Sequence, residues 1–139
     1  MNITRIALAT LGGFVAYFAV GGLTFTLLPS LKIEFRKYPA VYRSHEGIMS
    51  TMPFGMAAML VAILALAVLY AMSYRGGSGL VEGARFGALV GVFVFGAFVV
   101  HNYVNLNIGL KLTLQQAVAY FLEWLITGLV IGLIYRPTR

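Results

Sequence analysis

Apolar residues run along this chain in four long blocks that are separated by polar breaks. The blocks cover about residues 6–28, 52–74, 86–105 and 114–135. Each is long enough for a helix that crosses a bilayer, which needs about 20 mostly apolar residues. Proline follows the first block at Pro29 and the last at Pro137, as is common after a helix end. The pattern predicts four transmembrane helices.

Short breaks require each helix to run antiparallel to the one before it. We therefore expect an all-α membrane protein, one up-down-up-down bundle that forms a single domain over residues 1–139. Composition agrees, because 60% of the residues are hydrophobic, 10% are charged and the mean hydropathy is +0.90. Soluble domains have about a quarter charged residues. The first block is too long for a removable signal peptide and lacks a small-residue cleavage site.

The one sizeable break, residues 30–48, mixes aromatic and basic side chains. Its apolar and basic positions alternate, which is typical of a segment at the membrane interface. The side chains expected at the lipid headgroups are Lys32, Arg36, Lys37, Tyr38 and Arg43. The segment is either an arm that docks on anionic lipid or on a partner, or a solvated connector with aromatic anchors, and we favour the connector.

Ten basic and four acidic residues give a net charge of +6. The basic residues lie in the breaks, where they meet anionic headgroups and set topology, so no nucleic-acid partner is expected. The basic residues expected on one side of the membrane are Arg5, Arg75, Arg85, Arg136 and Arg139. Those expected on the other side are Lys32, Arg36, Lys37, Arg43 and Lys111. Because the two sides carry equal numbers of basic residues, the positive-inside rule gives no orientation. We take both termini to lie on the cytoplasmic side.

Glycines at four-residue spacing mark one face of each of the last two helices. They are Gly83, Gly87 and Gly91 in the third helix, and Gly128 and Gly132 in the fourth. Small residues let helix backbones approach closely in lipid. We expect these two helices to pack on each other, although the same stripes also suit a homodimer seam.

The fourth helix carries polar side chains on one face, namely Gln116, Tyr120, Glu123 and Thr127. Glu123 lies near mid-span, where an ionised carboxylate costs about 3 kcal/mol on insertion scales. If the last two helices form a hairpin, His101 pairs in depth with Tyr120, and Asn105 with Gln116. The pattern then predicts a contact between His101 and Glu123, either direct or through Tyr120 or water.

This polar face has two interpretations. Intramembrane ionisable residues are functional candidates by default, and a histidine beside a carboxylate responds to protons. The alternative is a buried hydrogen-bond network that locks the third helix to the fourth, which we place slightly ahead. A haem on His101 or His45 is conceivable, but loop histidines are usually solvated. The chain has no cysteine, no aspartate and no catalytic motif, so we expect no cofactor, no metal and no enzyme activity.

Residues 83–135 resemble small four-span bacterial membrane proteins that are catalogued as domains of unknown function. The resemblance rests on "GARFGALVGVFVFGAFVVHNYVNLN" and "LKLTLQQAVAYFLEWLITGL". These stretches share a glycine-rich third helix with an Asn-containing end, a short turn, and a fourth helix with an aromatic centre. The resemblance implies a four-helix fold and a bacterial cytoplasmic membrane, and it implies no activity.

The expected function is transport or permeation of a proton, cation or small solute along the Glu123 and His101 face, in a homo-oligomer. The alternative is a structural or accessory subunit of a larger membrane complex, bound through the glycine faces and the basic connector.

Overall fold

The computed structural model describes residues 1–136. Its helices are α1 (Ile3–Leu27), α2 (Pro29–Arg36), α3 (His45–Ser73), α4 (Gly79–Val94), the π-helical segment η1 (Phe95–Val100), α5 (His101–Asn105) and α6 (Leu110–Tyr135). Because α4, η1 and α5 follow one another without a break, four helices are long and apolar enough to span a membrane. The predicted all-α, four-helix membrane architecture is confirmed. Arg139, which the charge count includes, lies outside the described residues.

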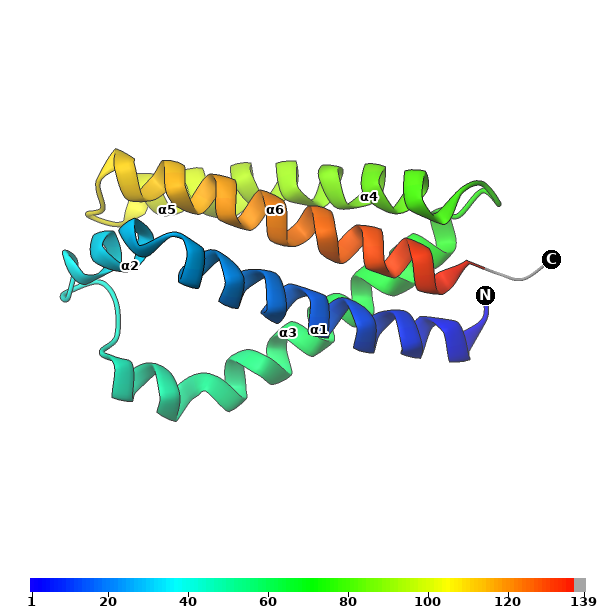
Figure 1. Cartoon of the computed structure of the whole chain (residues 1–139), viewed down its shortest axis with the longest axis horizontal. Coiled ribbons are helices and arrows are strands. Elements are labelled where there is room, and N and C mark those ends of the chain that lie inside the picture. Colours follow the sequence, from blue (N-terminus) through cyan, green and yellow to red (C-terminus); the bar gives the residue numbers. More distant parts are fainter. Residues whose placement is uncertain (137–139) are drawn as a thin grey trace.

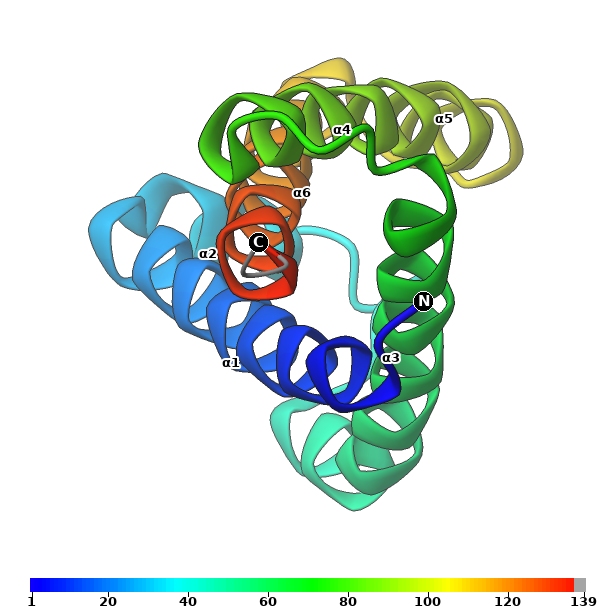
Figure 2. The ribbon, with the colours of Figure 1, turned by 90° about the vertical axis from the view of Figure 1, so that its right-hand side faces the viewer.

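The four spans run up and down, so the start of α1 and the end of α6 lie at the same end of the molecule (Figure 1). We call this the terminal end, and the opposite end, which holds α2, the connector end. Viewed from the terminal end, α6 lies between α1 and α4, and α3 packs mainly against α1 (Figure 2). The central position of α6 makes it the most buried span.

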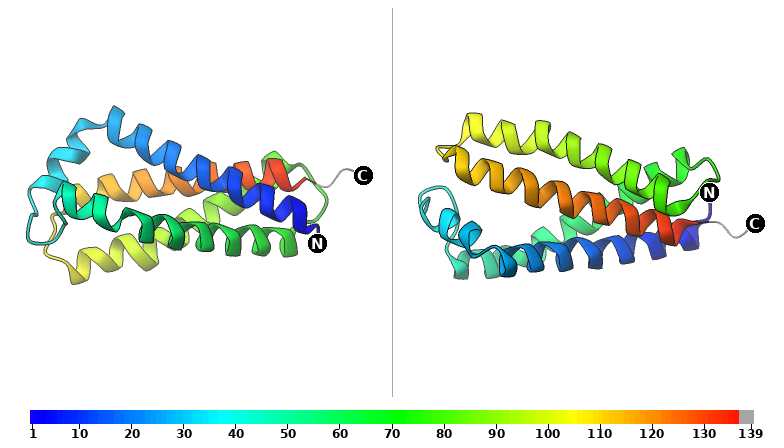
Figure 3. Two further views of the ribbon diagram at one scale, coloured as in Figure 1. Left: turned by 90° about the horizontal axis from the view of Figure 1, so that it is seen from below. Right: turned by 45° about the horizontal axis from the view of Figure 1, so that its top comes forward.

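Glycine backbones bring α4 and α6 together. Gly79, Gly83, Gly87 and Gly91 are all buried on α4. A Cβ atom added at Gly83 would lie 2.7 Å from the Gly128 carbonyl oxygen and 3.0 Å from Gly132 Cα. The two helices run side by side along their length (Figure 3). The four-residue glycine spacing therefore serves packing within the chain.

All four spans begin earlier than the apolar blocks predict, the first by three residues at Ile3. The N-terminal end of α3 is capped by Ser44, whose hydroxyl accepts a hydrogen bond from Gly47 N–H at 3.2 Å, so the helix starts at His45. Pro53 consequently lies inside α3 and not in its first turn. The third span begins at Gly79 and α6 at Leu110. The connector also contains the helix α2, in place of an alternating interfacial strip.

The first half of α3 stands apart from the other helices. The consecutive residues 53–58 are all exposed. Since a helical turn takes 3.6 residues, side chains on every side of the helix are exposed there. Figure 1 shows the same arrangement, with the start of α3 diverging from α1 at the connector end.

Candidate functional site

Among residues 1–136, Glu123 is the one carboxylate buried within a membrane-spanning helix, and it points at α1. The residue is 4% exposed. Its Oε1 atom would lie 3.3 Å from a Cβ atom at Gly21, so α1 comes close because that position has no side chain. One turn earlier on α1, the Tyr17 hydroxyl lies within electrostatic range of the Glu123 carboxyl group. The first span therefore supplies a hydroxyl group beside Glu123.

Aromatic rings hold this part of the bundle in position. Tyr17 packs against Trp124 with ring centroids 5.0 Å apart. Tyr120 packs edge-on against Phe98 at 5.7 Å, which ties α6 to η1. Such pairs contribute about 0.5–1.5 kcal/mol beyond the area that they bury. The Tyr17 and Tyr120 side chains are therefore fixed beside Glu123 and not free to turn into lipid.

Polar side chains continue from Glu123 toward the connector end. The Tyr120 hydroxyl lies within electrostatic range of both Glu123 and Tyr42. Tyr42 in turn accepts a hydrogen bond from Gln116 Nε2 at 3.2 Å. Gln116 is 4% exposed, although its amide is polar. We call Tyr17, Tyr42, Gln116, Tyr120 and Glu123 the polar string.

The polar string ends at Glu123. Thr127 is fully buried, but its hydroxyl donates a hydrogen bond to the Glu123 backbone carbonyl oxygen at 2.7 Å. This bond lies within α6 and does not extend the polar string. About two helical turns further toward the terminal end, a dry layer is formed by Ile63, Ala67 and Ile131, each 0% exposed. The carboxyl group is thus linked by polar side chains to one end of the bundle and separated by apolar ones from the other.

His101 and Asn105 do not join this site, so the predicted contact between His101 and Glu123 is wrong. Both residues are exposed, and Asn105 Nδ2 donates to the His101 carbonyl oxygen at 2.9 Å. The glycine packing sets the register, since Gly91 faces Phe121. His101 is ten residues beyond Gly91, and Glu123 lies two residues from Phe121 in the opposite direction, so the two are roughly 18 Å apart along the bundle.

The register of the last two helices explains the error. The predicted register paired His101 with Tyr120, whereas Gly91 packs against Phe121, so the helices are offset by about nine residues, or two and a half turns, from the prediction. The turn between them is shorter than expected, because α6 begins at Leu110 and not near Leu114. His45, the other histidine considered for haem, is exposed at the first position of α3. Within residues 1–136, no three His, Cys, Asp or Glu side chains come together as metal ligands.

The connector is bound to α6 through a buried carboxylate. Glu34, whose side chain is 4% exposed, pairs with Lys37 at 2.7 Å and with Lys111 at 2.9 Å. Hydrogen bonds from Lys37 and Lys111 hold the pKa of Glu34 below its ordinary value. The Tyr38 hydroxyl accepts a hydrogen bond from Gly109 N–H at 2.9 Å. Two of the five residues expected at lipid headgroups, Lys37 and Tyr38, are therefore engaged within the protein.

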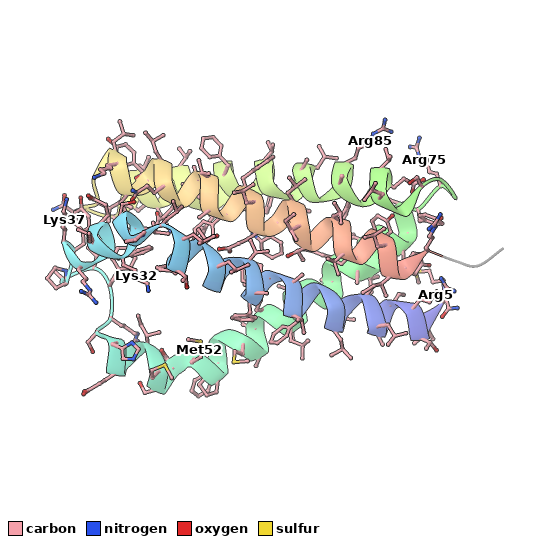
Figure 4. All side chains as sticks on the ribbon, in the orientation of Figure 1. Arg5, Lys32, Lys37, Met52, Arg75 and Arg85 are labelled. Carbon is pink, nitrogen blue, oxygen red and sulfur yellow. The ribbon has the colours of Figure 1, made fainter. Side chains whose placement is uncertain are left out.

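The other three residues expected at the headgroups, Lys32, Arg36 and Arg43, are exposed. Figure 4 shows Lys32 and Lys37 at the connector end, and Arg5, Arg75 and Arg85 at the terminal end.

Sequence reasoning missed Tyr17, Gly21 and Tyr42. The available signal was the spacing of Tyr17 and Gly21, a polar and a small residue one turn apart in an apolar helix.

Comparisons with protein-family models, with curated proteins and with solved structures each gave no match. The resemblance of residues 83–135 to uncharacterised four-span proteins therefore stays a prediction. What the sequence and the fold support together is a small multi-pass integral membrane protein.

Proposed function

We propose that the protein is a small proton transporter and that Glu123 is its proton-binding group. The observation that carries this proposal is the burial of a carboxyl group at mid-span, beside tyrosine hydroxyls and without an ion pair among residues 1–136. An ionised carboxylate in the membrane centre costs about 3 kcal/mol on insertion scales. Binding a proton removes the charge, so this site couples protonation to the energy of the bundle.

A purely structural role does not need an acid at this position. A glutamine has the same size and accepts a hydrogen bond from Tyr17 without the cost of burying a charge. A proton also needs no cavity, whereas a hard metal cation takes six or more oxygen ligands. Glu123 is the one carboxylate here, so the proton is the favoured ion.

Access to Glu123 is expected from the connector end, along Gln116, Tyr42 and Tyr120. The layer of Ile63, Ala67 and Ile131 would close the opposite route in this state. Transport then needs a second state in which the layer opens. The helix best suited to move is α3, because most side chains of its first half are exposed and make few contacts with the other helices.

Flux measurements in liposomes test the proposal. The purified protein should dissipate an imposed pH gradient faster than empty vesicles, as read with an entrapped pH-sensitive dye. Glu123→Gln should reduce the rate to that of empty vesicles. Glu46→Gln is the matched control, because Glu46 is an exposed carboxylate in the first turn of α3, and this variant should keep the wild-type rate. No flux with the wild type, or equal flux with Glu123→Gln, would overturn the proposal.

A second candidate is a structural or accessory subunit of a larger complex in a bacterial cytoplasmic membrane. It is favoured by the bare first half of α3, a surface on which a partner's helix fits. Purification in mild detergent distinguishes the two. A stoichiometric partner would support the accessory role, whereas a stable homo-oligomer without other proteins would count against it.

A further inference from the structure

The start of α3 and the end of α1 diverge at the connector end (Figure 1), and we call the space between them the gap. Residues 53–58 of α3 are exposed on every side, including the side toward α1, and an added Cβ atom at Gly55 meets nothing within 4 Å. On α1, residues 25–27 are exposed as well. Both borders belong to helices that span the membrane. In a bilayer, hydrocarbon must occupy the gap, because apolar helix surfaces there exclude water.

The mouth of this gap carries cations on both sides. Lys32, in α2, points toward the start of α3 in the view of Figure 4. Arg43 lies beside the first turn of α3, with its Cβ atom 3.3 Å from an added Cβ at Gly47. Both are exposed, and the ion pairs of residues 1–136 use Lys37 and Lys111 instead. Two positive charges therefore remain available at headgroup depth.

The orientation of α2 is fixed from its other face. Leu31 and Glu34 are buried against the start of α6, and Gln115 Nε2 donates to Ser30 Oγ at 3.2 Å. With this face held, Lys32 and Arg36 are kept on the exposed side. Ile33, which is 57% exposed between them in sequence, adds an apolar contact for lipid. Cations next to exposed apolar side chains are typical of a surface that binds anionic lipid.

We propose that an anionic phospholipid lies in the gap between α1 and α3 at the connector end, with its phosphate group bound by Lys32 and Arg43. Its acyl chains cover the bare half of α3, and its headgroup closes the mouth. The site takes one lipid class by charge, since zwitterionic headgroups give little net attraction to the two cations. The inference is independent of any role for Glu123.

Native mass spectrometry of the intact protein in mild detergent tests this site. Phosphatidylglycerol should remain bound with an affinity roughly tenfold or more above that of phosphatidylcholine. The double variant Lys32→Gln and Arg43→Gln should lose this preference. The matched control, Arg75→Gln and Arg85→Gln, removes two exposed cations at the terminal end and should keep it.

Three results would overturn the proposal. The first is equal binding of the two lipids by the wild type, and the second is unchanged phosphatidylglycerol binding by the Lys32 and Arg43 double variant.

The third concerns the occupant of the gap. The chain has no cysteine, so Phe54→Cys places a single thiol on the bare part of α3, where Phe54 is 78% exposed. Complete disulfide cross-linking in membranes would show a second copy in place of lipid. Glycerol phosphate should not displace the lipid, because the free headgroup lacks the chains that fill the gap.

Discussion

Replacing Gly87 by alanine should loosen the packing of α4 on α6, because the added methyl group has no free space. A Cβ atom at Gly87 would lie 2.6 Å from the Leu125 carbonyl oxygen and 2.7 Å from the Trp124 carbonyl oxygen. Both are backbone atoms, so no side-chain rotation relieves the overlap. Ordinary van der Waals contact begins at 3.4 Å, so the two helices must separate locally by up to about 0.8 Å.

The expected loss is about 1–2 kcal/mol in the free energy of unfolding. Overpacking a tight interface costs about 1–3 kcal/mol. Alanine recovers up to about 1 kcal/mol, because it is a better helix former than glycine. Gly55 is the matched control, since it lies within α3 and an added Cβ atom meets nothing within 4 Å. Gly55→Ala should therefore be neutral or slightly stabilising.

Unfolding in mixed micelles measures this difference. A denaturing detergent is titrated in, and the fluorescence of Trp124, the single tryptophan, reports the transition from its position in the core. Gly87→Ala should unfold at a lower fraction of denaturing detergent than the wild type and Gly55→Ala. If Gly87→Ala and Gly55→Ala unfold together, close backbone contact is not what holds α4 on α6.

Two further substitutions test other parts of the fold. Because the pKa of Glu34 is lowered by Lys37 and Lys111, its ion pairs should stabilise the protein at neutral pH and lose this effect as the pH falls below about 4.3, the ordinary glutamate value. Glu34→Gln should therefore flatten the acid side of a plot of unfolding midpoint against pH, and an unchanged plot would refute the ion-pair account. Tyr70→Phe should be neutral or stabilising by up to about 1 kcal/mol, because the buried Tyr70 hydroxyl has no hydrogen-bond partner among residues 1–136. A clear loss of stability in thermal unfolding would reveal a partner for that hydroxyl.

Helix number, helix pairing and the position of Glu123 could be predicted because each depends on local pattern. Four apolar blocks predict four spans, and glycines every four residues predict a close helix pair. The depth of contacts between helices could not be predicted in the same way. It depends on the register of the two helices, and an error of about nine residues moved His101 from the level of Tyr120 to the edge of the bundle.

The connector shows a second limit of pattern analysis. Its apolar positions also fit a period of two, through Leu31, Ile33 and Phe35. In the structure, Leu31 and Glu34 are buried together on a helix and Ile33 is exposed. A buried glutamate breaks the apolar pattern, and only its partners Lys37 and Lys111 explain its place. Similarly, nothing in α6 indicates which other helix supplies Tyr17 to Glu123.

Proton flux across a series of variants at position 123 tests the central claim most directly. Wild type, Glu123→Asp and Glu123→Gln are compared in liposomes at one imposed pH gradient, with unfolding midpoints measured on the same preparations. The account predicts substantial flux for Glu123→Asp, which keeps an acid, and the leak rate of empty vesicles for Glu123→Gln, with both variants folded. Equal flux in wild type and Glu123→Gln would contradict it, as would equal losses of flux and stability in both variants.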